Sequence, residues 1–568
     1  MLTRLHVRNF KTLDDVSVEL GQNVVLVGQN NSGKTTALQA LSLWQSGMRE
    51  WLARRSGSKA RERTGVTLNR RALTHTPVRE ARFLWRNLRL SHSGAEARNG
   101  GGRVKIEIIL EGQRADGAWQ CGLEFDYANP ESIYCRPLRS ADDVEDALPE
   151  IPPAAKEVRL AFLPPMSGLV TEEAELQPGR LEVLIGEGRT AEVLRNLCFQ
   201  VFDKSPENWA RIVADIQRMF RMRLHAPERD QVRGEVDLKY HQDGCDLDIA
   251  SAGRGAQQVL LLLAHLRFNP GAVLLLDEPD AHLEILRQRS VYTLLTNAAR
   301  ETGSQIVAAS HSEIILNEAA DRDVVVTFVG RPHRIDDRGA QVLKALKDIG
   351  FEHYYQAERK GCVLYLEGST DLAILQAWAR KLAHPAGELL AEPFVEFVGN
   401  NHGRALSHFF GLREAKPDLL GFALFDRLEP GRAMRSDFAI EHRLWSRREI
   451  ENYLTMPAVL LRYAEGAEPD DLVGQANRES RREAMLGAIG DIEGALRTLG
   501  EDPWGPDIKA SERVLPQIFA AYSRRLSLSD HTNKSDFHIL ASAMRADEIA
   551  PEVKSVLDAL HRTLSRSA

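Results

Sequence analysis

The chain has 568 residues, of which 43% are hydrophobic and 27% are charged, and the excess of Asp and Glu over Lys and Arg gives a formal net charge of −7. This is the composition of a globular protein, which excludes a disordered, collagen-like or coiled-coil chain, and the length corresponds to about three to five domains. Five cysteines without a CxxC pair exclude a disulfide framework and a cysteine zinc site. The apolar runs are shorter than the roughly 20 residues of a membrane span, and the N-terminus lacks the apolar core of a signal peptide. We therefore expect a cytoplasmic protein in a reducing compartment, with no membrane partner.

The first forty residues predict a phosphate-binding loop. Alternating residues at 2–8 and 14–20 predict two strands, and an apolar strand at 24–27 runs into a loop with the Walker A spacing, followed by a helical pattern. The glycines let backbone N–H groups point at phosphates, and the helix presents its positive end. We expect the Lys34 ammonium to contact the β- and γ-phosphates of ATP and the Thr35 hydroxyl to bind Mg²⁺. The nucleotide-binding residues expected in this loop are Gly28, Asn30, Asn31, Ser32, Gly33, Lys34, Thr35 and Thr36.

Weaker signals follow between residues 50 and 240. Residues 49–71 contain eight Lys and Arg against two Glu, which suits binding to a phosphate backbone, although a solvated basic loop or helix explains the pattern equally well. Alternation at 105–110 predicts a strand, and residues 140–150 form an acidic loop. Apolar residues at helical spacing in 190–202 and 209–220 predict two helices.

The second half of a nucleotide site is expected between residues 250 and 311. An apolar strand at 273–276 ends at Asp277 and Glu278, which fit the Walker B roles of binding Mg²⁺ through water and polarising the attacking water. Upstream, Ser251 and Gly253 precede an apolar helix, so a hydroxyl and backbone N–H groups form an anion site. A further strand at 305–310 ends next to His311, which can reach a γ-phosphate.

This ordered set of motifs resembles the ABC-type ATPases of the SMC/RecF/Rad50 class, over residues 1–45 and about 245–330. The resemblance implies an α/β ATPase head over residues 1–355, split by an insertion at about 140–240 that adds strands and a helical dimerisation element. It also implies that the Ser251-x-Gly253 signature contacts the ATP of a partner protomer. We therefore expect a homodimer or a higher homo-oligomer through the heads.

A second candidate site follows a domain boundary that we expect near residues 350–360, where residues 356–361 break the pattern. A buried strand at 363–366 ends at Glu367, and Asp371 opens the next helix. A strand at 393–400 follows, and a third strand in the stretch 419–429 ends at Asp426. The stretch 441–454 contains a short strand that leads to Glu449 and Glu451. Strands that alternate with helices form parallel sheets, whose carboxyl ends meet at one edge. Carboxylates gathered there repel one another unless Mg²⁺ or Mn²⁺ neutralises them, and two such ions about 4 Å apart support phosphodiester cleavage.

These residues resemble a Toprim domain, and an SMC-like ATPase followed by Toprim is the arrangement of the OLD (overcoming lysogenization defect) nucleases, which include the nuclease subunit of the Gabija anti-phage system. The resemblance implies a Rossmann-like Toprim core at 356–465 and a helical C-terminal part at 466–568. It implies that Glu367, Asp371, Asp426 and Glu451 are the acidic motif residues and that Lys534 assists the leaving group or transition state. Glu449 is a further expected metal ligand. It also implies a helicase of the UvrD class or a reverse transcriptase as companion.

One position departs from the Toprim pattern, because Leu428 replaces the second aspartate of the DxD motif and Glu429 lies one residue out of phase. The second metal is then held differently, one ion alone binds tightly, or cleavage has been lost. Three functions stay open: an ATP-regulated DNA nuclease in anti-phage defence, a PARIS-like effector that cleaves RNA or tRNA, and an ATP-switched sensor scaffold. The histidines of the C-terminal third, His408 among them, show no metal-ligand spacing and are predicted to be ordinary.

Overall fold

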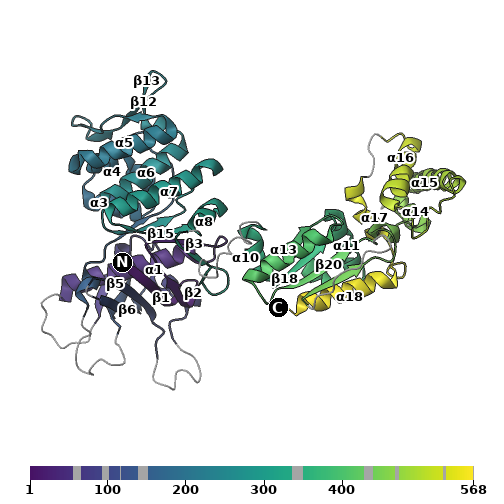
Figure 1. Cartoon of the computed structure of the whole chain (residues 1–568), viewed down its shortest axis with the longest axis horizontal. Helices are drawn as coiled ribbons and strands as arrows, with labels where there is room; N and C mark the ends of the chain where they lie inside the picture. Colours follow the sequence, from purple (N-terminus) through teal and green to yellow (C-terminus); the bar gives the residue numbers. More distant parts are fainter. Residues whose placement is uncertain are drawn as a thin grey trace. The chain divides into compact units, whose positions relative to one another are not determined.

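The computed structural model divides into two compact units, Met1–Leu343 and Lys344–Ala568, and each is described by itself (Figure 1). The described residues are 1–55, 65–91, 102–115, 117–138, 151–320, 322–335, 349–427, 439–466, 472–528 and 533–566. The expected acidic loop at 140–150, part of the basic stretch, and Leu428 and Glu429 of the departing motif lie outside these residues. Within the described part, no helix combines the length and apolar character that crossing a bilayer requires.

The first unit contains two six-stranded sheets, each built from segments far apart in the sequence. The antiparallel sheet has the order β2-β1-β5-β6-β7-β4. Its strands are β1 (Leu2–Phe10), β2 (Leu13–Glu19), β4 (Val66–Asn69), β5 (Ile106–Arg114), β6 (Gly117–Asn129) and β7 (Ser132–Pro137). The second sheet has the order β17-β16-β3-β15-β14-β8 and is parallel except for its edge strand β17. Its strands are β3 (Asn23–Val27), β8 (Leu160–Leu163), β14 (Val273–Asp277), β15 (Gln305–Ser310), β16 (Val324–Thr327) and β17 (His333–Arg334).

Helix α1 (Lys34–Arg55) lies between the two sheets, and this explains why the central strands are mostly apolar and buried throughout. All residues of β3, β14 and β15 are buried, as expected for strands covered on both faces. One face packs with α1 and the antiparallel sheet, where Trp44 is fully buried. The expected strands at 24–27, 273–276 and 305–310 and the helix after the Walker A loop are confirmed.

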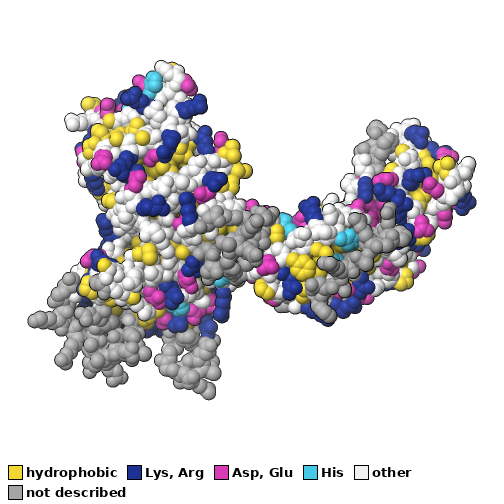
Figure 2. Space-filling view, in the orientation of Figure 1, with side chains coloured by type: hydrophobic (Ala, Val, Ile, Leu, Met, Phe, Trp, Pro, Cys, Tyr) yellow, Lys and Arg dark blue, Asp and Glu magenta, His cyan; other side chains and the backbone are white. Residues whose placement is uncertain are grey.

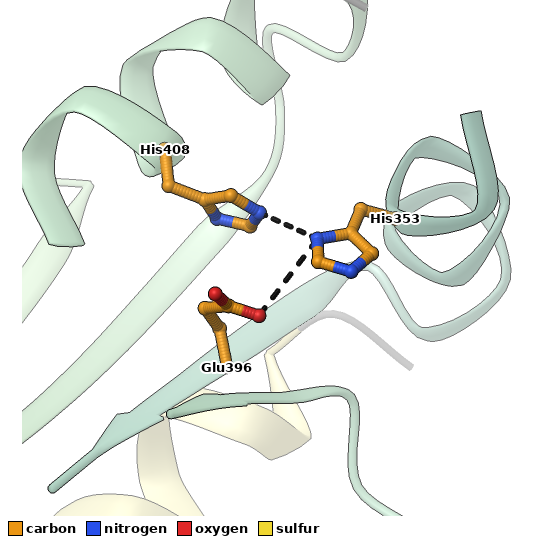
Figure 3. Close-up of side chains that lie close together, drawn as sticks. All are labelled: His353, Glu396 and His408. Carbon is orange, nitrogen blue, oxygen red and sulfur yellow. Dashed lines mark hydrogen bonds and ion pairs between the residues drawn. The ribbon is translucent and has the colours of Figure 1, made fainter. Parts of the chain in front are cut away.

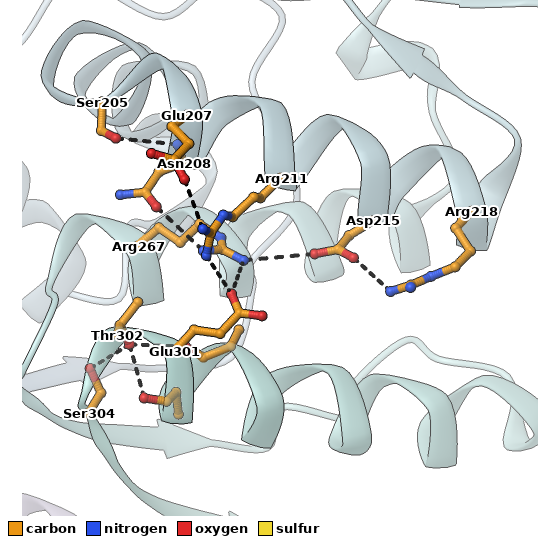
Figure 4. A network of polar contacts seen from close by, with 12 residues as sticks. Ser205, Glu207, Asn208, Arg211, Asp215, Arg218, Arg267, Glu301, Thr302 and Ser304 are labelled. Carbon is orange, nitrogen blue, oxygen red and sulfur yellow. Dashed lines mark hydrogen bonds and ion pairs between the residues drawn. The ribbon is translucent and has the colours of Figure 1, made fainter.

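A helical layer covers the other face of the parallel sheet. It consists of α3 (Pro178–Gly186), α4 (Leu194–Lys204), α5 (Pro206–Phe220), α6 (Arg254–Phe268) and α7 (Ile285–Thr302). A polar network fixes α5 onto α6 and α7 (Figure 4). The buried Arg267 guanidinium of α6 pairs with Glu301 of α7 at 3.2 Å and with Asp215 of α5 at 4.0 Å, and Arg211 of α5 also reaches Glu301 at 3.0 Å.

The described part of the predicted insertion is integrated into the first unit. Strand β8 pairs in parallel with β14, and α4 and α5 pack on α6, so these segments complete the sheet and its helical cover. Short antiparallel ribbons follow: β9 (Arg223–Leu224), β10 (Glu228–Asp230), β11 (Glu235–Asp237), β12 (Lys239–Gln242) and β13 (Cys245–Asp248). The two helices expected near 190–202 and 209–220 are confirmed as α4 and α5.

The second unit is built on a four-stranded parallel sheet with the order β19-β18-β20-β21. The strands are β18 (Cys362–Leu366), β19 (Val395–Phe397), β20 (Leu420–Phe425) and β21 (Ile440–Leu444). Helices α10 (Phe351–Lys360) and α13 (His402–Ala415) pack against each other, and α10 also packs on β18. The apolar core that includes Leu364 and Leu366 of β18 is formed with helices that follow this strand, both between the other strands and after them. These are α11 (Ser369–Lys381), α12 (Ala386–Ala391), α14 (Pro457–Glu465), α15 (Leu472–Thr498), α16 (Leu515–Arg525), α17 (His538–Ala543) and α18 (Pro551–Ser565).

One sequence expectation in this region is wrong. Residues 356–361 do not interrupt the structure, because they form the end of α10, and the two units divide before this helix rather than within it. Glu, Lys and Arg dominate the exposed positions of α10, while Phe351, Tyr354 and Ala357 form its buried stripe. Gly361 ends the helix in the left-handed conformation with φ of 65°, which glycine adopts without strain.

Candidate functional site

The Walker A loop has the conformation of a phosphate cradle. Gly28 and Gly33 have φ of 154° and 104°, and a Cβ on Gly28 would lie 2.9 Å from the Ser32 hydroxyl, so glycine is required there. Asn30 and Asn31 are exposed, and Asn31 has φ of 64°. The Ser32 hydroxyl is buried without a hydrogen-bond partner among the described residues. The loop thus offers backbone N–H groups and a hydroxyl to an anion at the start of α1.

Lys34 and Thr35 connect this loop to the end of β14. The buried Lys34 ammonium donates to the carbonyls of Gly28 (2.7 Å) and Gln29 (2.8 Å), and burial lowers its pKa against the opposing effect of three acidic neighbours. The Thr35 hydroxyl donates to Asp277 at 3.0 Å, and burial raises the pKa of Asp277 to about 6. Thr36 is held by a 3.2 Å hydrogen bond between its hydroxyl and that of Thr12. The predicted Mg²⁺ ligands Thr35 and Asp277 are therefore adjacent, although 242 residues separate them.

The residues after Asp277 face the end of β15. Glu278 has φ of 48°, in the left-handed region, and its carboxylate lies 3.8 Å from the Nδ1 atom of His311. Both side chains are partly exposed, so they can reach a bound nucleotide. The buried Asp280 accepts a hydrogen bond of 2.7 Å from the Ser310 hydroxyl, and burial raises its pKa. Sequence reasoning did not single out Asp280, although its place three residues after the Walker B aspartate was a usable signal.

Ser251 and Gly253 lie at the start of α6, not in the Walker A loop, and both are exposed. Gly253 is the residue before the first turn, and no atom lies within 4 Å of where its Cβ would be. The neighbouring helix is buried almost throughout, with Gln257 donating back to the carbonyls of Ile249 and Ala252 at 3.0 Å each. The start of α6 is therefore exposed to solvent, while the helix behind it is buried.

A second group of acidic side chains gathers where the parallel strands of the second unit end. Glu367 follows β18, Asp426 follows β20, and Glu451 lies in a 3-10 turn, η8 (Ile450–Tyr453), beyond β21. Asp371 in the first turn of α11 points back, and its carboxylate accepts a 3.2 Å hydrogen bond from the Glu367 N–H. Because β18, β20 and β21 are neighbours in a parallel sheet, their carboxyl ends share one edge. We call Glu367, Asp371, Asp426 and Glu451 the carboxylate cluster.

The pKa values show how strongly these carboxyl groups affect one another. Burial, together with a hydrogen bond to the Glu367 side chain and the charges of the other members, raises the pKa of Asp426 to about 9. Burial and the charge of Glu367 raise the pKa of Asp371 to about 7, and burial and the charge of Glu449 raise that of Glu451 to about 7. Carboxyl groups that interact in this way resist being ionised together, and a bound cation would relieve their repulsion.

Lys534 provides one positive charge at this edge. Its ammonium lies 3.5 Å from Glu451 Oε1, and the charges of Glu451, Glu449 and Glu367 raise its pKa against the effect of burial. Lys534 belongs to a short turn, η10 (Lys534–Asp536), far along the chain from the strands. The buried Glu451 Oε1 makes this ion pair and no hydrogen bond among the described residues, so a cation binding there would compete with the Lys534 ammonium.

Glu449 is placed differently from the other acidic residues. Its carboxylate accepts hydrogen bonds from the N–H and the hydroxyl of Ser511, the latter at 3.0 Å. Ser511 lies in a π-helical turn, η9 (Ala510–Val514), a feature often found at functional sites. The Glu449 carboxylate therefore holds η8 and η9 together beside the cluster, a contact that the sequence did not reveal.

Comparisons with known proteins agree with the motifs of the first unit. Residues 1–47 match the family described as "AAA ATPase domain", and residues 145–317 match the one described as "AAA domain, putative AbiEii toxin, Type IV TA system". The chain is 24% identical over 372 residues to a protein named OLD nuclease from Thermus scotoductus. That match covers 60% of this chain and 66% of the relative, so it spans slightly less than two thirds of the relative's length.

Three similar solved structures are SMC head domains. They are the SMC head bound to the C-terminal winged-helix domain of ScpA (14% identity, TM-score 0.35, 59% of this chain and 97% of that chain), the SMC head from Thermotoga maritima (14%, 0.30, 59% and 98%), and an SMC head with an extended coiled coil bound to the C-terminal domain of ScpA from Pyrococcus furiosus (13%, 0.37, 61% and 99%). The ATPase families and the OLD nuclease similarity confirm the resemblance to OLD-type ATPase nucleases that the motifs indicate.

Proposed function

We propose that the chain is an ATP-regulated, metal-dependent nuclease of the OLD type, whose first unit binds ATP and whose carboxylate cluster cleaves nucleic-acid phosphodiesters. The observation that carries the proposal is the gathering of buried and half-buried acidic groups at one sheet edge, after β18, after β20 and beyond β21, with the pKa of Asp426 raised to about 9. The similarity to an OLD nuclease supports the same reading. The domain that bears the cluster is, in this proposal, a Toprim core followed by a helical C-terminal part.

The residue types present suit a divalent cation, although no three ligand oxygens of the carboxylate cluster lie within 4.8 Å of one another among the described residues, so binding would draw these side chains together. Carboxylate oxygens are the ligands that Mg²⁺ and Mn²⁺ prefer, and the buried Glu451 Oε1 lacks a hydrogen-bond partner among the described residues. Glu367, Asp371, Asp426 and Glu451 would hold the metal, while the bonds from Ser511 to both oxygens of Glu449 favour a supporting role for that residue. When bound, the metal supplies positive charge for the attacking water and for the leaving oxygen.

The chain's own residues complete the proposed chemistry. The Lys534 ammonium keeps its proton, because three carboxylates raise its pKa, and can stabilise negative charge on a phosphate. In the first unit, Lys34 and the loop N–H groups bind the phosphates of ATP, Thr35 and Asp277 hold its Mg²⁺, and Glu278 orients the attacking water. In this proposal Ser251 and Gly253 contact the nucleotide of a second copy, which makes ATP binding a dimerisation signal.

The test is nucleic-acid cleavage by the purified full-length protein with Mg²⁺ or Mn²⁺, with and without ATP. Glu367→Gln should abolish cleavage and leave ATP hydrolysis intact, because the amide keeps the shape and loses a metal-binding charge. The matched control is Glu388→Gln, an exposed glutamate of α12 in the same unit. Cleavage by Glu367→Gln at the wild-type rate would show that the carboxylate cluster is not the nuclease site.

The same assay separates the substrate classes. We propose DNA as the substrate and anti-phage defence as the role, from the resemblance to the OLD nucleases. A substrate panel of plasmid DNA, linear DNA and tRNA distinguishes this from a PARIS-like RNA nuclease by the product formed. Basic and acidic side chains are interspersed on the face drawn in Figure 2, so this face offers no broad basic surface. We therefore expect nucleic acid to bind at the sheet edge that carries the carboxylate cluster.

A sensor scaffold is the second candidate, and Leu428 is the observation that favours it. Without the second aspartate of DxD, the cluster has one ligand fewer than the motif supplies. A scaffold would bind ATP and form dimers yet cleave neither DNA nor tRNA under any nucleotide or metal condition. Co-purification with a helicase or a reverse transcriptase from the native host would identify the companion that the resemblance implies.

A further inference from the structure

A second polar cluster lies in the second unit, built from residues that the proposed nuclease does not use. His353 of α10, Glu396 of β19 and His408 of α13 each offer one ligand atom, and these atoms all lie within 4.8 Å of one another. Among the described residues, this is the one group of three or more such side chains that meets this distance. Figure 3 shows the three side chains pointing toward one another from three different elements. We call them the histidine cluster.

The distances suit a small cation. His353 Nδ1 lies 2.7 Å from His408 Nε2 and 3.9 Å from Glu396 Oε2. A tetrahedral ion about 2.1 Å from each ligand separates the ligand atoms by about 3.4 Å, a value between these two distances. A hydrogen bond between the two imidazoles explains only the 2.7 Å distance between His353 and His408. It leaves Glu396 Oε2, at 3.9 Å, beyond hydrogen-bond range of His353. A shared cation would engage all three groups after shifts of less than about 1 Å.

Neighbouring side chains orient the ligand atoms as they do in metal sites. The Tyr365 hydroxyl lies 2.8 Å from His408 Nδ1, so the other ring nitrogen, Nε2, faces His353. Ligating histidines characteristically use their second nitrogen in such an outer hydrogen bond. The Arg404 guanidinium donates to Glu396 Oε1 at 2.9 Å, which directs Oε2 toward the cluster. The rings of Tyr365 and Phe394 pack edge-on against the imidazoles and fix their orientation.

A cavity of about 540 Å³ adjoins the cluster. Besides the three cluster residues, it is lined by Ile349, Arg404, Ser407 and Gly411. Three protein ligands next to a cavity leave a coordination position for water or a small anion, and Arg404 supplies a positive charge beside it. Two imidazoles and one carboxylate select a transition metal over Mg²⁺ or Ca²⁺, which prefer all-oxygen ligands.

We propose that His353, Glu396 and His408 bind one divalent transition-metal ion, with Zn²⁺ as the probe, at a site separate from the carboxylate cluster. The bound ion joins α10, β19 and α13, three elements that the sequence order keeps apart. Since α10 is the first described helix of the second unit, the metal would fasten the start of this unit onto its sheet. The inference does not depend on the nuclease proposal.

The test is the number of Zn²⁺ ions bound by the metal-stripped full-length protein, measured by calorimetric titration with Mg²⁺ present to occupy the carboxylate cluster. The wild type should bind one more Zn²⁺ per chain than the double variant His353→Gln/His408→Gln. When Co²⁺ is added instead of Zn²⁺, the wild type should show a visible absorption band that the double variant lacks. Tyr365→Phe should keep this stoichiometry and weaken the affinity about 10- to 100-fold, as for lost outer-shell partners.

Two controls separate the metal from general effects. His384→Gln removes another partly buried histidine of this unit that pairs with a carboxylate, that of Asp558 at 3.1 Å, and should leave Zn²⁺ binding unchanged. Glu367→Gln should leave it unchanged as well. If the double variant fails to fold, Glu396→Gln, which keeps both histidines, is expected to lower the Zn²⁺ affinity. Equal Zn²⁺ binding by the wild type and the cluster variants would overturn the proposal in favour of a simple histidine hydrogen bond.

Discussion

Replacing Asp426 by Asn should make the metal-free second unit more stable at alkaline pH. Asp371, Asp426 and Glu451 all have raised pKa values, caused first by burial and then by neighbouring carboxylates. A raised pKa means that the folded state binds more protons than the unfolded chain between the two pKa values. The stability that these protons provide is present at low pH and is lost as the pH rises through the folded pKa, that is, through about 7 and then about 9.

The size of this loss follows from the pKa values. Between pH 6 and pH 8, a carboxyl group with a folded pKa of about 7 loses about 1.4 kcal/mol, and one with a pKa of about 9 loses about 2.7 kcal/mol. The groups share the same repulsion, so these values do not add, and we expect a total loss of about 3 kcal/mol for the wild type. Asp426→Asn removes the carboxyl group whose pKa is raised most, together with the effect of its charge on the pKa values of the other groups. This should reduce the loss of stability between pH 6 and pH 8 to about 1 kcal/mol.

The assay is calorimetric unfolding of the full-length protein in EDTA and in saturating Mg²⁺, across pH 6 to 8. Each kcal/mol corresponds to roughly 2–4 °C for a unit of this size. In the wild type, Mg²⁺ at about 100 times its dissociation constant should restore about 2.7 kcal/mol, and in Asp426→Asn it should restore much less. The matched control is Asp418→Asn, an exposed aspartate beside Lys416 in the same unit. Wild-type stability that is flat across this pH range in EDTA would refute the reasoning.

Three further predictions concern the first unit. Lys34→Ala should abolish binding of a fluorescent ATP analogue, because the phosphates lose their buried counter-charge; binding at wild-type affinity would exclude this role. Glu278→Gln should retain ATP binding, slow hydrolysis in a phosphate-release assay and shift the protein toward a dimer in size-exclusion chromatography with ATP; unchanged hydrolysis would place the water-orienting group elsewhere. Arg267→Ala should lower the free energy of unfolding by about 2 kcal/mol, since the buried guanidinium that pairs with Glu301 at 3.2 Å and with Asp215 at 4.0 Å is lost, whereas the exposed Arg218→Ala should change it by about 0.5 kcal/mol or less.

The features predicted correctly from sequence are those fixed by local patterns. Strands covered on both faces, such as β3 and β14, read as continuous apolar runs, and the Walker A spacing determines its own loop. The meeting of Glu367 and Asp426 follows from one rule, that parallel strands end at a common edge. Each of these inferences requires only the sequence of a short segment and, for the shared edge, the direction of the strands.

The contacts that sequence could not predict depend on how helices pack over the sheet. His353 and His408 meet because α10 and α13 pack together, and neither position shows a ligand spacing along the chain. The hydrogen bonds from Ser511 to Glu449 likewise depend on a π-helical turn, which no periodicity in the sequence predicts. The mistaken break at 356–361 had a local cause, since a charged helix surface ended by Gly361 resembles a loop in composition.

The two carboxylate sites differ in how their charge is balanced, and this difference bears on their need for metal. At the nucleotide site, the buried Lys34 ammonium and the Thr35 hydroxyl counteract the burial of Asp277, whose pKa rises only to about 6. At the cluster, Lys534 opposes the charges of several acidic groups, and the pKa of Asp426 still rises to about 9. The cluster therefore retains more uncompensated negative charge when its groups ionise. The cluster needs a cation for its groups to ionise together, whereas Lys34 and the loop N–H groups contact nucleotide phosphates directly, so chelation should abolish the proposed nucleic-acid cleavage while nucleotide binding is weakened but retained.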